Sequence, residues 1–150
     1  MSKPASLEQF GDQIISLLPQ VMKEIARYEN NYVTTGKITC QQFLTLCVIA
    51  DQKQWTMKDL ADTMRLSYSS MTGLADRLLK HALIVRRRDE GDRRSVIVST
   101  TPKGKKIIRE VYGQKRRGMM ELFGRLSARE RQDYLDILNK LVDKLSSKKS

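Results

Sequence analysis

The chain has 150 residues, a length that suits one domain or one domain with dimerisation appendages. It carries 28 Lys and Arg against 17 Asp and Glu, a formal net charge of +11 at pH 7. This excess favours nucleic acid or an anionic membrane surface as the partner. No apolar run approaches the roughly 20 residues of a membrane span, and no basic-then-apolar leader opens the chain, so we expect a cytoplasmic protein.

Cysteine and histidine are too few for most metal and catalytic sites. One histidine, His81, and two cysteines, Cys40 and Cys47, argue against zinc, and a catalytic triad would have to use His81 itself. The sequence contains no glycine-rich phosphate loop, paired-carboxylate motif or nucleophile elbow. We therefore predict no enzyme, no metal and no resident cofactor. Cys40 could be a redox sensor because a helix start lowers a thiol pKa, but two buried small residues are the preferred interpretation.

The N-terminal segment has the period of an amphipathic helix, with apolar residues three or four positions apart. Proline inside a helix removes a hydrogen bond at a cost of about 3 kcal/mol, so we expect a kink or break at Pro19. Residues 1–6 should be frayed. A stripe with no partner of its own is expected to pack against another chain. The stripe consists of Leu7, Phe10, Ile14, Leu18, Val21, Ile25 and Tyr28.

Helix-start signals recur along the rest of the chain. Thr39 with Gln42 and Ser127 with Glu130 fit capping boxes, and Thr56 with Asp59 is a weaker version. Ser67 is the expected cap of a helix over residues 68–80, whose inner face is Met71, Leu74, Ala75 and Leu78. Two β-branched runs, residues 84–85 and 96–98, flank a polar tip and predict a hairpin. Thr101 and Pro102 begin a long helix. A last helix ends near Leu145, and residues 146–150 should be disordered.

The order of the predicted elements is that of a winged helix-turn-helix: a short helix over 56–64, a turn, a second helix over 68–80 and a hairpin over 83–99. In this motif the second helix enters the major groove of DNA. We predict a mainly α fold with a small β wing. Residues 39–101 would be the winged helix-turn-helix DNA-binding domain, and residues 7–33 and 102–146 dimerisation helices.

Positive charge is concentrated in that domain and just after it. Residues 65–106 hold 11 basic and 4 acidic side chains, so this segment contributes +7 of the total charge. A solvated charged surface is the alternative, but the neighbouring helix-turn-helix favours DNA contact. A narrow minor groove suits Arg93 or Arg94 at the wing tip, and Asp92 is interpreted as an internal partner that orients Arg94.

The second helix carries small hydroxyl side chains, which allow close approach to base edges. Tyr68 could stack on a sugar or pack locally. Arg77 could contact a phosphate or pair with Asp76 or the wing. The predicted DNA-contact residues are Ser67, Tyr68, Ser69, Ser70, Thr72, Gly73, Arg77, Arg88, Arg93 and Arg94.

Two motifs carry a family resemblance. The wing segment 92–94 and the junction 99–104 are similar to the Asp-x-Arg wing and the Leu-Thr-x-x-Gly junction of the multiple-antibiotic-resistance regulator (MarR) family, with Thr100 in the usual leucine place. Residues 69–78 look like its recognition helix, and the chain from Leu7 to Leu145 resembles the family as a whole. Two positions depart from the pattern. Gly73 stands where many members have a large polar or basic residue, and Ala82 stands in the usual glycine place.

The resemblance implies a triangular homodimer built from the first and the last two helices, with recognition helices in major grooves and wings in minor grooves. It also implies a small phenolic or otherwise anionic effector, for which a cleft near Phe43, Cys47, Met71 and the first helix is the suggested site. The family's peroxide-sensing branch has its reactive cysteine in the first helix, where this chain has none.

We therefore predict a nucleoid-associated, homodimeric transcription regulator, a ligand-responsive repressor rather than an activator. Its operator should be a palindrome with half-sites about one helical turn apart. The alternatives are a winged-helix protein-interaction module and a non-specific architectural DNA-binding protein. A nucleic-acid enzyme would need a metal or nucleophile cluster.

Overall fold

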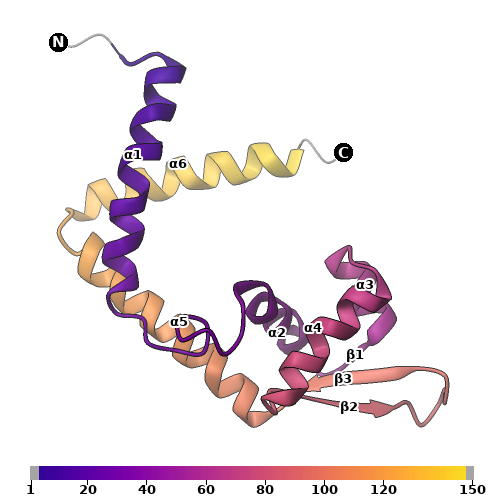
Figure 1. The fold of residues 1–150 in the computed structure, drawn as a ribbon. Helices are drawn as coiled ribbons and strands as arrows, with labels where there is room; N and C mark the ends of the chain where they lie inside the picture. Colours follow the sequence, from indigo (N-terminus) through magenta and orange to yellow (C-terminus); the bar gives the residue numbers. More distant parts are fainter. Residues whose placement is uncertain (1–3, 148–150) are drawn as a thin grey trace. The chain divides into compact units, whose positions relative to one another are not determined.

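The computed structural model describes residues 4–147 and is mainly helical with one small sheet, as predicted (Figure 1). In chain order the elements are α1 (Leu7–Ala26), α2 (Cys40–Asp51), β1 (Trp55–Thr56), α3 (Met57–Met64), α4 (Tyr68–Lys80), β2 (Ile84–Arg88), β3 (Val96–Thr100), α5 (Pro102–Phe123) and α6 (Ala128–Ser147). Within the described residues no helix is long and apolar enough to cross a membrane.

The chain divides into two compact units. The described residues up to Tyr28 and from Lys115 form one, here called the helical unit, and Glu29–Gln114 form the other, the winged unit. These borders differ from the predicted domain limits, because the loop after α1 and the first part of α5 cluster with the winged unit. Helix α5 therefore passes from one unit to the other without a break.

Capping side chains begin the helices where the sequence predicted them. Thr39 accepts from the Gln42 amide, at 3.1 Å, while the Gln42 side chain accepts from the Thr39 amide, at 2.9 Å. Ser127 and Glu130 exchange the same pair of bonds. Thr56 and Ser67 accept from the third amide of their helices. A further capping box, between Ser6 and Gln9, was not predicted and starts α1.

Of the two outcomes expected at Pro19, a kink or a break, the break is wrong, because α1 is continuous from Leu7 to Ala26, and the kink stays a prediction. Proline leaves the carbonyl four residues earlier, that of Ile15, without its helical donor. Both residues are exposed in this chain, so water can satisfy that carbonyl. The disorder predicted for the tail is also wrong for residues 146–147, which end α6. Residues 148–150, and 1–3 at the other end, lie outside the described part.

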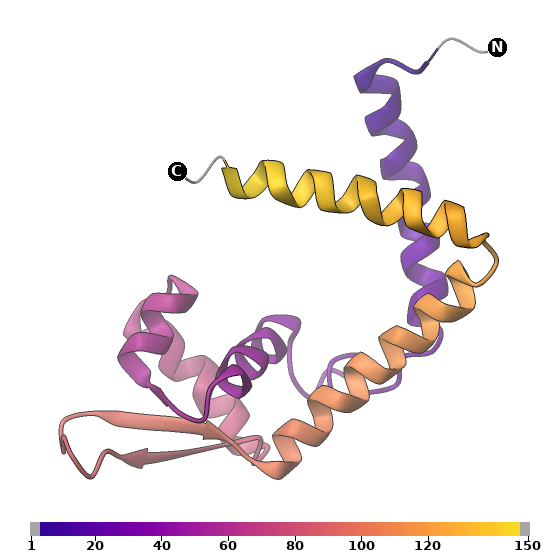
Figure 2. The same ribbon diagram turned by 180° about the vertical axis from the view of Figure 1, so that it is seen from behind.

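The sheet has the strand order β1-β3-β2, and both pairs are antiparallel. The predicted hairpin pairs Ile84 with Thr100 and Arg88 with Val96. Figures 1 and 2 show it projecting from the rest of the winged unit. Strand β1 was missed, because two residues, Trp55 and Thr56, are too short for a pattern. Since β1 directly precedes α3, its pairing with β3 attaches the helix-turn-helix to the wing.

The core of the winged unit collects side chains from α2, α3, α4, the sheet and the first part of α5. Met71, Ala75 and Leu78 of α4 are fully buried, as predicted, and Leu74 is half-buried. The largest fully buried side chains of this unit are Ile38, Leu46, Ile49, Met57, Leu60, Met71, Leu78, Leu83, Ile84, Val98 and Val111.

The start of α5 packs directly on the turn that follows α4. The Thr101 amide donates to the Leu83 carbonyl, at 3.1 Å, and the Thr101 hydroxyl donates to the Ala82 carbonyl, at 2.7 Å. That hydroxyl also accepts from the Gly104 amide, at 3.0 Å. A Cβ on Gly104 would overlap the Leu83 carbonyl oxygen, so only glycine fits. The Thr-x-x-Gly part of the junction is therefore a packing requirement.

Ala82 adopts the left-handed backbone conformation, with φ of 57°. The Ala82 amide donates to Leu79, at 2.9 Å, and the Leu83 amide donates to Leu78, at 3.0 Å, which is the Schellman pattern that ends many helices. The turn thus keeps the conformation that glycine favours although alanine occupies the position. Left-handed backbone costs a residue with a Cβ about 1–2 kcal/mol.

Replacing Ala82 with glycine is expected to raise the free energy of unfolding by about 0.5–1 kcal/mol. The relief of strain exceeds the entropy that glycine adds to the unfolded chain. Urea unfolding followed by circular dichroism measures the change. Gly36 is the matched control, because it also has positive φ, 71°, and open space around it. Gly36→Ala should lower stability, and an unchanged or less stable Ala82→Gly would contradict the strain argument.

Candidate nucleic-acid interface

Helix α4 turns one face into the core and exposes the other. Four of the predicted contact residues on it, Tyr68, Ser69, Ser70 and Gly73, are exposed, whereas Thr72 and Arg77 are half-buried. Apart from its chain neighbours and the nearby backbone of the helix itself, no atom of the described residues lies within 4 Å of where a Gly73 Cβ would stand, so the backbone is uncovered at this position. The exposed face is slim enough to enter a groove closely.

Local hydrogen bonds fix the orientation of the hydroxyl groups on this face. Ser67 accepts from the Ser70 amide, at 3.1 Å, and donates to the Ser70 hydroxyl, at 2.8 Å. The Thr72 hydroxyl donates to the Tyr68 carbonyl, at 2.9 Å. The hydrogens of Ser67 and Thr72 are thereby committed, whereas Ser70 receives a bond and keeps its own hydrogen to donate.

Two aspartates shape the wing tip. Asp92 accepts from the Arg94 backbone amide, at 3.0 Å, and from the Ser95 hydroxyl, at 2.9 Å. Asp89 accepts from the Gly91 amide, at 3.2 Å. The two bonds lower the pKa of Asp92, that from Arg94 most, because both stabilise the ionised carboxylate. Asp92 therefore acts on the main chain of Arg94, and Arg93 and Arg94 remain exposed.

The arginines of β2 differ in their partners. Arg86 forms an ion pair with Asp76 of α4, at 3.2 Å. Asp76 therefore pairs with the wing, and the alternative pairing of Asp76 with Arg77 is wrong. Arg87 donates to the Gln54 side chain, at 3.1 Å. Arg88 is exposed. An exposed ion pair contributes roughly 0–1 kcal/mol, so its main effect is to set the direction of Arg86.

A hollow of about 500 Å³ lies where the starts of α3 and α4 meet the wing. Its lining includes the basic side chains of Lys58 and Arg94, the Tyr68 ring and one carboxylate, that of Asp59. The structure thus brings a predicted helix residue and a predicted wing residue to one surface. It adds Lys58, which the sequence analysis missed. The only signal for Lys58 was a basic side chain in the first turn of the first helix of the motif.

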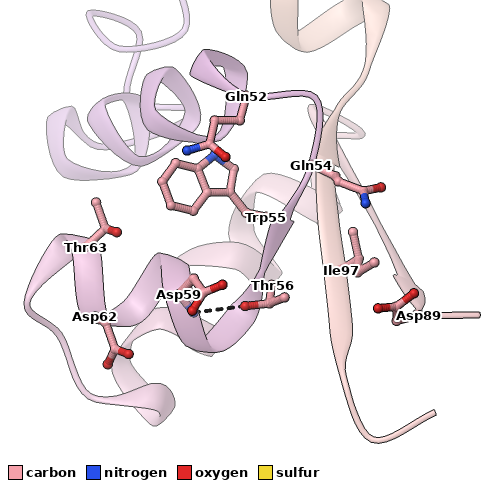
Figure 3. Close-up of a pocket in the computed structure, with 9 residues that line it drawn as sticks. All are labelled: Gln52, Gln54, Trp55, Thr56, Asp59, Asp62, Thr63, Asp89 and Ile97. Carbon is pink, nitrogen blue, oxygen red and sulfur yellow. Dashed lines mark hydrogen bonds between the residues drawn. The ribbon is translucent and has the colours of Figure 1, made fainter. Parts of the chain in front are cut away.

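A second hollow, of about 510 Å³, has a different character (Figure 3). Three carboxylates line it, those of Asp59 and Asp62 in α3 and Asp89 in the wing. The Thr56 hydroxyl accepts from the Asp59 amide there, at 3.0 Å, which is the cap of α3. Carboxylates repel phosphates, so this hollow is not a phosphate cradle.

The structure changes the interpretation of the suggested effector cleft and of the cysteines. Phe43 and Met71 are 5% and 0% exposed, so they are packed core residues and do not line an open cleft. Cys47 is half-buried, and burial raises the pKa of its thiol, an effect that the hydrogen bond from Tyr112 opposes only in part. Cys40 is exposed, so the expectation that both cysteines are buried is wrong for it.

A slim exposed helix beside an arginine-bearing hairpin defines a winged helix-turn-helix DNA-binding protein. The MarR family model matches residues 38–96. Over 151 residues the chain is 30% identical to YsmB, an HTH-type transcriptional regulator of Bacillus subtilis, and the alignment covers 98% of this chain and 99% of the relative. The chain belongs to the MarR family and is a DNA-binding transcription regulator.

Solved structures agree with this assignment. The fold is similar to that of the YusO protein from Bacillus subtilis, with a TM-score of 0.76, 23% identity and coverage of 93% of this chain and 99% of that one. It is also similar to Bordetella bronchiseptica BpsR, whose DNA binding is regulated by 6-hydroxynicotinic acid, with a TM-score of 0.60, 25% identity and coverage of 94% and 99%. The predicted family and fold class are confirmed.

The order of the wing tip is expected to depend on acidity. The pKa of Asp92 is lowered by folding, so its stabilising contribution is complete above the ordinary aspartate value of about 3.9 and is lost as the pH falls through the lowered value. NMR titration of the Asp92 carboxyl measures its pKa, and titration of the Arg94 amide signal measures the order of the wing tip. Asp92→Asn should abolish the dependence. A carboxyl that titrates at or above the ordinary value would contradict this account.

Proposed function

We propose that two copies of this chain bind a palindromic operator in the cytoplasm and repress transcription there. The observation that carries the proposal is the exposed hydroxyl face of α4 beside a wing on which Arg93 and Arg94 are exposed and Asp92 bonds the Arg94 main chain. Repression follows physically when the occupied operator overlaps the site at which polymerase binds.

The affinity for DNA comes mainly from contacts between basic side chains and backbone phosphates. The segment 65–106 has a net charge of +7, and each neutralised phosphate releases counterions. Arg77, Arg88 and Lys58 are suited to the backbone, and the start of α4 at Ser67 offers free amides to a phosphate. Ser69, Ser70, Thr72 and the open backbone at Gly73 face the major groove, and Arg93 or Arg94 enters the adjacent minor groove.

The helical unit supports a homodimer. None of the described residues of α6 is buried, although the helix carries a long apolar stripe. Leu135, Leu141 and Leu145 are 51%, 55% and 68% exposed, and Leu7 and Leu18 of α1 are 86% and 50% exposed. An exposed apolar surface of this extent marks an interaction site, and a second copy covers it symmetrically.

A small phenolic or otherwise anionic effector would modulate binding. This part of the proposal is supported by family membership and by the regulation of BpsR by 6-hydroxynicotinic acid. The operator itself is accessible by selecting bound duplexes from a random library, with and without candidate effectors. Equal binding of random and selected duplexes would instead indicate an architectural protein, and the absence of binding at low salt would indicate a protein-interaction module.

Arg94→Ala is expected to weaken operator binding by about 1–3 kcal/mol while the dimer stays intact, because a groove contact is lost. Fluorescence anisotropy with the selected operator at fixed salt measures the loss. Lys140→Ala removes an equal charge from exposed α6 and should change affinity little. Unchanged affinity in Arg94→Ala would show that this arginine does not contact DNA. Equal losses of affinity in Arg94→Ala and Lys140→Ala would show that only the net charge of the protein matters.

Charges placed in the α6 stripe should dissociate the dimer. Ile137→Glu with Leu141→Glu puts two carboxylates where apolar contact is expected, which costs at least about 2 kcal/mol of dimer stability. Both side chains are more than half exposed in the single chain, so its fold should persist. Analytical ultracentrifugation measures the state, with Lys144→Glu as the control for added negative charge. A double variant that still sediments as a dimer would locate the interface elsewhere.

A further inference from the structure

The polypeptide passes between the two units twice, after Tyr28 and after Gln114. Within the winged unit, the Gln114 side chain joins these two connecting segments, because it bonds residues 30–31. Its Oε1 accepts from the Asn30 amide, at 2.9 Å, and from the Asn31 Nδ2, at 2.8 Å. Its Nε2 donates to the Asn30 carbonyl, at 3.0 Å. Three hydrogen bonds therefore bind α5 to residues more than 80 positions earlier, at the border of the unit.

Asn31 is itself held firmly, which makes the attachment rigid. It is 7% exposed, and its Oδ1 accepts from the amides of Val33, at 3.0 Å, and Thr34, at 3.3 Å. Its amide group thus bonds the turn on one side and Gln114 on the other. A buried amide with both ends satisfied loses much of its bonding if either partner moves.

The helical unit has a matching attachment one turn further along α5. A Cβ on Gly118 would lie 3.0 Å from the Cα of Ile25 and close to its carbonyl, so the two backbones are in direct contact. Gly113, beside Gln114, has open space around it. The last turn of α1 and the loop after it are thus fastened to α5 on both sides of the border, within each unit separately.

We propose that Gln114 is a positioning residue that makes the two passages act as one stiff connection and thereby sets the half-site spacing that the dimer accepts. The inference rests on the proposed function. A helix that connects two units alone bends and twists more easily than a helix to which a second connecting segment is hydrogen-bonded. In a dimer that stiffness fixes where each α4 is presented, and successive major grooves on one side of B-DNA lie about 34–36 Å apart.

The test is a spacing profile. The affinity of full-length protein is measured for the selected operator and for versions whose half-sites are one or two base pairs closer or further apart. Each added pair moves a half-site by about 3.4 Å and rotates it by about a tenth of a turn. Wild type should lose at least about tenfold per added or removed pair, whereas Gln114→Ala should lose less than about threefold, since a slack connection adapts to either site.

Three further variants separate the connection from local structure. Asn31→Asp removes the Nδ2 donor to Gln114 but keeps the oxygen that accepts from Val33 and Thr34. Both bonds between Gln114 and Asn30 remain, so this variant should flatten the profile in part. Gln114→Glu keeps an acceptor for Asn30 and loses the donor, so it should be intermediate. Gly113→Ala, in open space on the same turn, should keep the wild-type profile.

The outcomes are distinct. A wild-type protein that binds no duplex refutes the proposed function. A flat wild-type profile, or a sharp profile that persists in folded, dimeric Gln114→Ala and Asn31→Asp, refutes the positioning role alone. A uniform loss at every spacing assigns Gln114 to structure only and also overturns the inference. Circular dichroism and sedimentation establish folding and dimerisation, and Asn31→Asp carries the decision if Gln114→Ala does not fold.

Discussion

The close contact between Gly104 and the Leu83 carbonyl is the constraint on which the winged unit depends. It brings together the end of α4, the first strand of the wing and the start of α5, and Thr101 bonds the carbonyls of Ala82 and Leu83 in the same turn. Because α5 begins against this turn, the start of α5, the end of α4 and the first strand of the wing are packed together at one point.

Local chemistry explains which parts of the fold were predictable. The starts at Thr39, Ser67 and Ser127 follow from side chains that satisfy helix amides within three residues, and the hairpin follows from its β-branched runs. Strand β1 has only two residues, and its pairing with Val98 and Ile97 is determined by tertiary contact. The border inside α5 has no local signal either, because the helix continues through it and only long-range contacts define it.

Some features of the candidate site are likewise predictable from the sequence, and others depend on tertiary contacts. The exposure of Ser69, Ser70 and Gly73 follows from helical period, since the opposite positions are apolar. The partners of charged side chains do not follow from spacing: Asp76 of α4 pairs with Arg86 of β2 and not with its neighbour Arg77. Lys58 lines the same hollow as Arg94 only because α3 and the wing come together in the fold.

With α4 in a major groove, as proposed, the internal bond of Thr72 determines which bases its hydroxyl can contact. Because its hydroxyl hydrogen is donated to the Tyr68 carbonyl, the oxygen can offer only a lone pair outward. In a major groove such a group is satisfied by the exocyclic amines of adenine or cytosine, and not by the keto oxygens of guanine or thymine. Ser70, two positions earlier, retains a hydrogen for those oxygens. The two hydroxyls therefore differ in polarity, since the Thr72 oxygen can only accept and the Ser70 hydroxyl can donate, and a pair of bases presented in the reverse order would match neither.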